Sequence, residues 1–384
     1  MRPSAIRRSL VAVLVATVAV SALSPAFADP GKRRGPKPKK VPRPPVEYAP
    51  TCTYDYPYDV QRFDLTVNKE VTWGLYAMPK TTPKAIVVFA HGYGHTAESW
   101  RYHLGRVADQ LGVITVAMNY RGQIDTPGYP RPTSRGWQVQ EGAEDSIVAA
   151  QQFQQLCPMA KTIVMYGVSM GGNTAGLAAA AGAKRADGRT PLFDYLFDVE
   201  GAMNVTETYF EARALAASGN EFAVNAVEDI EREMRGPFES RSNTYLQRSV
   251  VTRMDDIKAA GIKGVVMVHG VDDGLVGYNQ SPEFYTRLRA VGIPVDFWTA
   301  ITRGERSEPG TTLDGYVTSF IPGFESPFAG HASEASDTHI VGMAGFERLA
   351  ALLRDGEAPA CRTGILDGTT GYTQEKPLTS PAGC

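Results

Sequence analysis

A serine flanked by glycines is the residue best suited to chemistry in this sequence. Gly167-Val168-Ser169-Met170-Gly171 has the pattern G-x-S-x-G, with the apolar run TIVMYG before it and GGNTAGLAAA after it. These flanks predict a strand and then a helix, so that the serine lies at a sharp strand-to-helix turn. Nearby glycines relieve backbone crowding at such a turn, and the helix dipole favours negative charge beside the hydroxyl. The pattern therefore predicts that Ser169 is a nucleophile.

A serine hydroxyl is a poor nucleophile unless a base removes its proton and a carboxylate orients that base. In the chain order typical of this motif, the acid follows a later strand. The predicted strand 264–270 runs directly into Asp272 and Asp273. Either aspartate therefore meets the requirement for the acid.

The base in this order is a histidine after the last strand. His331 and His339 both follow the predicted strand 294–300, whereas the other histidines lie too early, in a predicted helix or within a strand. We favour His331, which follows Gly330 in a loop and can fold over the serine. His339 remains the alternative, although it lies near the expected start of the final helix (340–353), where it would act as a structural cap.

Backbone N–H groups must stabilise the oxyanion that such a reaction forms. One is expected from Met170, directly after the nucleophile. The second is expected from Tyr93, because residues 91–94 form a glycine-containing loop after the apolar strand 85–90. The Tyr93 ring would then line the acyl pocket. The sequence has no P-loop, no dinucleotide-binding glycine motif and no Cys/His cluster, so neither a cofactor nor a metal is implied.

The elements that must position these residues alternate between strand and helix. Strands are predicted at 71–77, 85–90, 112–120, 161–167, 195–203, 264–270 and 294–300, and helices at 99–110, 141–156, after Ser169 and at 340–353. Runs such as AIVVFA, apolar on both faces, favour a parallel sheet with right-handed crossovers and helices on both sides. Between residues 204 and 260 only helical patterns occur, such as Glu221–Met234, which predicts a cap-like insertion over the ligand site.

These motifs, in this order, resemble the α/β-hydrolase family from about Val71 to Leu353. HGYG resembles the family's oxyanion segment, GVSMGG its nucleophile elbow, HGVDDGLV its H-G-x-x-D-x-x-V acid loop and AGHASEASDTH its G-H loop. The acid-loop alignment selects Asp273 over Asp272. The similarity is to dienelactone-hydrolase-like and exported esterase members. It implies the α/β-hydrolase fold, a mostly parallel doubly wound sheet, and hydrolytic chemistry without fixing a substrate.

The N-terminus has the features of an export signal followed by a basic tether. Residues 1–28 combine a basic start, an apolar run too short for a comfortable membrane span and a final Ala-Phe-Ala. We expect cleavage after Ala28, and Arg7-Arg8 leaves both the general and the twin-arginine routes open. Residues 29–50, rich in proline and basic residues, predict an extended spacer in preference to a segment that grips an anionic cell wall.

The N-terminal 50 residues differ in net charge from the rest of the chain. Residues 1–50 carry a net charge of +8, so the formal net charge of -2 for the whole chain leaves -10 for residues 51–384. An acidic surface argues against nucleic acid as a partner. No further stretch reaches the length of a membrane span. We expect residues 51–384 to form one hydrolase domain.

Four cysteines in an exported protein favour two disulfides, for which three pairings exist. Cys361 and Cys384 bracket a turn-rich tail, about 355–384, and could pin it. That pairing leaves Cys52 with Cys157.

The function predicted from these features is that of a secreted serine carboxylesterase acting on a small-molecule or polymeric ester. A secreted serine peptidase of the same fold, acting on short peptides, is the first alternative. An inactive hydrolase fold held near the cell wall by its tether is the second.

Overall fold

The computed structural model describes residues 52–54, 59–123, 136–301, 312–313, 316–317, 330–332, 339–367 and 372–377. All of them fall within one unit of the chain, Val46–Cys384. The expected signal (1–28) and tether (29–50) lie outside the described residues.

Ten strands of the described chain form one sheet, in the order β1-β2-β4-β3-β5-β6-β7-β8-β11-β12. They are β1 (Gln61–Val67), β2 (Glu70–Ala77), β3 (Ala85–Ala90), β4 (Ile114–Met118), β5 (Thr162–Val168), β6 (Tyr195–Val199), β7 (Gly264–Gly270), β8 (Val295–Ala300), β11 (Arg362–Asp367) and β12 (Tyr372–Pro377). Strands β4 through β11 of this order are parallel, and β1, β2 and β12 pair antiparallel. The predicted doubly wound, mostly parallel sheet is thus confirmed. Strands β9 (Thr312–Leu313) and β10 (Tyr316–Val317) form a separate small pair.

Helices cover both faces of the sheet because its central strands are apolar on both faces. They are α1 (Arg101–Leu111), α2 (Val139–Leu156), α3 (Met170–Ala180), α4 (Val205–Ala216), α5 (Glu221–Met234), α6 (Phe238–Arg248), α7 (Met254–Ala260), α8 (Gln280–Ala290) and α9 (Ile340–Ala350), with short turns η1 (Ala97–Trp100), η2 (Val250–Thr252) and η3 (Ala351–Asp355). On β3, Ile86 and Val88 join a core cluster with α2, α3, α7 and α8, whereas Val87 and Phe89 join a second cluster with α1 and α9. Within the described residues, no helix has the length and apolar character needed to cross a membrane.

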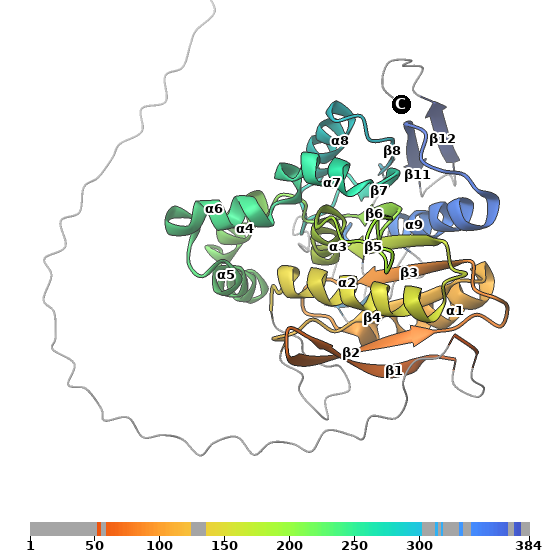
Figure 1. Ribbon diagram of the computed structural model, residues 1–384. Coiled ribbons are helices and arrows are strands. Elements are labelled where there is room, and N and C mark those ends of the chain that lie inside the picture. The colour runs from red at the N-terminus through yellow and green to blue at the C-terminus, as the bar shows by residue number, and fades with distance from the viewer. Residues whose placement is uncertain are drawn as a thin grey trace, which may run out of the picture. The chain divides into compact units, whose positions relative to one another are not determined.

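Helices α4, α5 and α6 lie between β6 and β7 in the chain and gather to one side of the sheet (Figure 1). We refer to these three helices, Val205–Arg248, as the cap. Helix α7, which follows them, instead packs into the core through Ile257. The cap is therefore an insertion in the crossover that runs from β6 through α7 to β7.

Two strands near the C-terminus differ from the sequence-based prediction of a turn-rich tail. Strand β11 adds to the sheet parallel to β8, and β12 pairs antiparallel with β11. The strand at 294–300 is therefore not the last of the sheet. The segment RTGILD resembles a strand only weakly because it mixes two charged residues, a glycine and only two large apolar residues. Gly364 is required there, since a Cβ atom would lie 2.0 Å from the Trp298 ring.

Cys52 and Cys157 form a disulfide that joins the segment before β1 to the C-terminal end of α2. This pairing agrees with the prediction. Cys361 is also disulfide-bonded, and its predicted partner Cys384 lies outside the described residues.

Candidate active site

Ser169 lies at the turn between β5 and α3 with φ 58° and ψ -129°. A positive φ is uncommon for a residue with a side chain and is expensive unless the surroundings impose it. Here the backbone is held on both sides: the Ser169 N–H donates to the Val199 carbonyl at 3.0 Å, and its carbonyl accepts from Gly172 and Ala202 at 2.8 and 3.1 Å. The turn therefore keeps Ser169 at the end of β5 and at the N-terminus of α3.

The two glycines of the motif make this turn sterically feasible. A Cβ atom on Gly167 would lie 2.0 Å from the Gly171 carbonyl oxygen, and one on Gly171 would lie 2.2 Å from the Ala90 carbonyl oxygen. Real Cβ atoms do not approach so closely, so neither position accepts a side chain without moving the backbone. The two glycines of the motif are therefore required by the close packing of β3, β5 and α3 at this point.

Asp273 and His331, far apart in the chain, come together beyond the end of β7. The His331 Nδ1 atom lies 2.7 Å from Asp273 Oδ2, while Asp273 Oδ1 accepts the N–H groups of Leu275 and Val276 at 2.8 and 2.9 Å. Gly330, at φ 76°, permits this approach, because a Cβ atom there would lie 2.4 Å from the Asp272 carbonyl oxygen. The geometry is that of an imidazole oriented by a carboxylate through Nδ1.

Burial would raise the pKa of Asp273, but the adjacent imidazoles of His331 and His269 outweigh it and hold the pKa below its usual range. His269, fully buried at the end of β7, has its Nε2 3.2 Å from Asp273 Oδ2 and 3.0 Å from the Val276 carbonyl. Its Nδ1 lies 2.7 Å from Ser281 Oγ. His269 therefore helps to fix Asp273 in its ionised form, a contact that was missed in the sequence.

His339 caps the final helix. It is buried, and its Nδ1 accepts the Val341 N–H at 3.3 Å at the start of α9. Burial, with the nearby charge of His331, lowers the pKa of His339 from 6.5 to about 4. A base with so low a pKa would bind a proton from the nucleophile poorly at neutral pH, which favours His331 for that role.

The lowered pKa of His339 predicts a pH-dependent loss of stability. The unfolded chain takes up this proton near pH 6.5 and the folded protein only near pH 4, so folding is fully supported above pH 6.5 and weakens as the pH falls. Urea unfolding gives the free energy of unfolding at pH 7 and at pH 4.5. Its decrease between the two should be about 2 kcal/mol larger for the wild type than for His339→Asn, which keeps a capping oxygen but does not titrate. Equal losses for the two proteins would contradict this.

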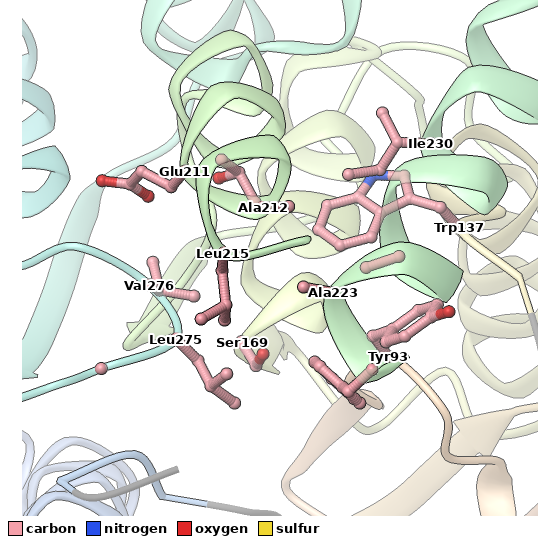
Figure 2. Close-up of a pocket in the computed structure, with 14 residues that line it drawn as sticks. Tyr93, Trp137, Ser169, Glu211, Ala212, Leu215, Ala223, Ile230, Leu275 and Val276 are labelled. Carbon is pink, nitrogen blue, oxygen red and sulfur yellow. The ribbon is translucent and has the colours of Figure 1, made fainter. Parts of the chain in front are cut away.

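A cavity of about 170 Å³ opens between the end of the sheet and the cap. Ser169 lies on its floor, with Ala212 and Leu215 of α4 above it (Figure 2). The lining is predominantly apolar and comes from the segments after β3, β4, β5 and β7 and from α4 and α5: Tyr93, Trp137, Ser169, Thr208, Glu211, Ala212, Leu215, Phe222, Ala223, Ala226, Ile230, Gly274, Leu275 and Val276. Since this volume is below the range of about 300–1,000 Å³ for drug-sized ligands, the cavity suits a small apolar group.

The predicted oxyanion donors lie close to Ser169: Tyr93 lines the cavity, and Met170 directly follows the serine. Met170 is the first residue of α3, so its N–H has no acceptor within the helix. The Tyr93 side chain lines the cavity, its hydroxyl donates to Asp229 Oδ2 of α5 at 2.8 Å, and its ring meets Phe222 edge to face at 5.4 Å. Tyr93 thereby connects the loop after β3 to the cap.

Two carboxyl groups and one imidazole lie close enough together to be considered as ligands of a metal ion. Among the described residues, Glu200, Asp273 and His331 each place one potential ligand atom within 4.8 Å of the others. Asp273 already accepts two backbone N–H groups and faces two imidazoles, while Glu200 accepts from Gly270 and Ala332. We therefore interpret the cluster as a hydrogen-bonded acid–base group.

Comparisons with known proteins agree with this fold. A family model described as the alpha/beta hydrolase family matches residues 87–299, and a search of curated proteins gives no significant match. Among solved structures, a puromycin hydrolase is similar with a TM-score of 0.50 at 15% identity, over 79% of this chain and 41% of that one. An acylaminoacyl peptidase of Pyrococcus horikoshii (TM-score 0.48, 19% identity, 62% and 36%) and an esterase of Pyrococcus furiosus (0.45, 18%, 63% and 81%) are also similar.

The chain spans only about a third of the length of the acylaminoacyl peptidases, and at these identities the likeness concerns the fold alone. The family model, by contrast, covers more than half of this chain and includes the strands that carry Ser169 and lead into Asp273. The protein belongs to the alpha/beta hydrolase family.

Proposed function

We propose that the protein is an exported serine carboxylesterase that works through an acyl-enzyme on Ser169. The observation that carries this proposal is the 2.7 Å contact between His331 Nδ1 and Asp273 Oδ2, beside a cavity whose floor is Ser169. A hydrolase fold with an oriented imidazole and a strained, pocket-lining serine has the parts that acyl transfer needs.

In the proposed mechanism, His331 Nε2 takes the proton of the Ser169 hydroxyl as Oγ attacks the ester carbonyl. Asp273 stabilises the imidazolium that forms, and the N–H groups of Met170 and Tyr93 stabilise the oxyanion. The imidazolium then gives its proton to the leaving alcohol, which leaves the acyl group on Ser169. Water attacks this ester with His331 again as the base, and the carboxylic acid is released.

The lining of the cavity supports a small, uncharged acyl group in this mechanism. Apolar and aromatic side chains cover most of the surface around Ser169, and among the described residues that line it none is basic and able to hold an anionic group. Export is supported by the Cys52–Cys157 disulfide, since such bonds persist in oxidising compartments, and by the expected signal at 1–28.

One lining residue favours a second candidate function. Glu211 on α4 contributes a carboxyl group to the cavity, where burial and the charge of Glu207 raise its pKa to about 7. A carboxylate at this place could accept the free amine of an aminoacyl substrate. A peptidase acting on short peptides is therefore the alternative to the esterase.

A substrate panel separates the two functions. We expect p-nitrophenyl esters of short acyl chains to be turned over faster than aminoacyl p-nitroanilides, with kcat/KM falling as the acyl chain outgrows the cavity. Faster turnover of the anilides, together with a selective loss of that activity in Glu211→Gln, would establish the peptidase instead. An ester activity that did not fall with acyl length would contradict the role of the cavity in acyl selection but leave the esterase assignment intact.

A further inference from the structure

Glu200 is a buried carboxyl group beside the proposed triad that the mechanism above does not use. It follows β6 directly, in the sheet position next to the strand that ends in Ser169. The residue is fully buried, and a buried carboxyl is costly unless its oxygens are hydrogen-bonded. The contacts of Glu200 must therefore offset the cost of its burial.

Both carboxyl oxygens of Glu200 bind backbone N–H groups on other elements. Oε1 accepts from Gly270 at the end of β7 at 3.2 Å, and Oε2 accepts from Ala332 at 2.6 Å. Gly270 leads into the Asp273 loop, and Ala332 is the residue after His331. One side chain therefore fastens the loop that carries the base to the strand that carries the acid.

The backbone of Glu200 is strained in a way that its side chain explains. Its φ is 51°, in the left-handed region where a glycine would cost less. A residue with a side chain persists there when its contacts outweigh the cost of this backbone conformation. In Glu200 those contacts are the two bonds to the loops that hold His331 and Asp273.

Glu200 is also within reach of the imidazole itself. Its Oε2 lies 3.7 Å from His331 Nδ1, compared with 2.7 Å for Asp273 Oδ2. Burial and the negative charge of Asp273 raise the pKa of Glu200, while His269 acts against them. With Asp273 ionised, Glu200 thus tends to keep its proton, and removal of the Asp273 carboxylate removes the repulsion that opposes a second charge.

We propose that Glu200 is a positioning residue for His331, which holds the imidazole loop in place and becomes the carboxylate partner of Nδ1–H when Asp273 is removed. This inference rests on the proposed function, because it assigns Glu200 to the same acid–base group. Asp273→Ala leaves space for the ring to turn toward Glu200, which then ionises and accepts the Nδ1–H bond. Asp273→Asn instead fills that space with an amide whose N–H₂ faces Nδ1 and favours the wrong tautomer.

The test is a double-mutant cycle on a short p-nitrophenyl ester, with kcat and KM measured separately. Glu200→Gln places an N–H₂ against a backbone N–H and should lower kcat about tenfold or more with little change in KM, because the base loses its position and the pocket does not change. Asp273→Ala should keep more activity than Asp273→Asn. In the Asp273→Ala background, Glu200→Gln should remove at least a further tenfold, about the effect of losing the remaining carboxylate.

Equal kcat for Asp273→Ala and Asp273→Ala/Glu200→Gln would overturn the proposal, as would a Glu200→Gln variant that lowers only the melting temperature. If the Glu200 variants do not fold, Asp273→Ala no more active than Asp273→Asn overturns it. Ester hydrolysis that survives Ser169→Ala would instead refute the proposed function, so the two failures are distinguishable.

Discussion

Ser169→Ala should reduce kcat for ester hydrolysis about 10⁵- to 10⁶-fold, because the covalent step loses its nucleophile and the other groups of the site act only with it. The variant should remain folded, since the elbow is held by backbone bonds to Val199, Gly172 and Ala202 that do not involve the hydroxyl. Stopped assays with p-nitrophenyl acetate and labelling by a fluorophosphonate probe measure the effect. Labelling of Ser169→Ala at the wild-type rate would place the nucleophile elsewhere.

Ser169→Gly is a matched variant that separates chemistry from strain. It should be as inactive as the alanine variant, yet more stable to urea by about 1 kcal/mol, since glycine adopts φ 58° without steric cost. A loss of stability would show that the turn is not strained by the side chain.

His331→Ala should lose activity to nearly the same extent as Ser169→Ala, about 10⁵-fold in kcat, because a serine hydroxyl without a base is not activated. The double variant Ser169→Ala/His331→Ala should be no worse than either single one, since the two residues act as a unit. Rates with the short ester, measured at one pH where both variants are folded, test this.

His339→Asn provides the control for His331→Ala. It keeps an N-cap on α9 and leaves the His331–Asp273 contact in place, so it should retain most of the activity. The opposite pattern, with His339→Asn inactive and His331→Ala active, would transfer the role of base to His339.

The sequence predicts those parts of the site that are marked by a local motif or by the order of the elements along the chain. Ser169 is marked by flanking glycines whose spacing follows from the contacts of Gly167 and Gly171 with neighbouring backbone. The meeting of Asp273 with His331 follows from chain order, because the carboxyl ends of parallel strands share one edge of a sheet. Neither conclusion required the cap or the long segment between β8 and His331.

The residues that contact the acid and the histidine loop, but are not themselves in the proposed triad, are harder to predict from the sequence. His269 and Glu200 lie within or just after apolar strands, where a polar residue has no partner in the sequence and gains one only from the tertiary fold. The one available signal was an acid directly after the apolar run YLFDV, next to the strand of the nucleophile. Strand β11 was missed for a related reason, because its pairing with β8 stabilises a segment of low strand propensity.

The cap enters the chain at a single connection, between β6 and β7, and supplies α4 and α5 to the cavity, while Ser169, Asp273 and His331 come from loops of the sheet. In the esterase proposed above, exchange of this one contiguous stretch would change the accepted acyl group without disturbing the proposed reacting atoms. Grafting Val205–Arg248 from a relative would transfer selectivity as a module, with Tyr93 and its bond to Asp229 as the junction that must be matched.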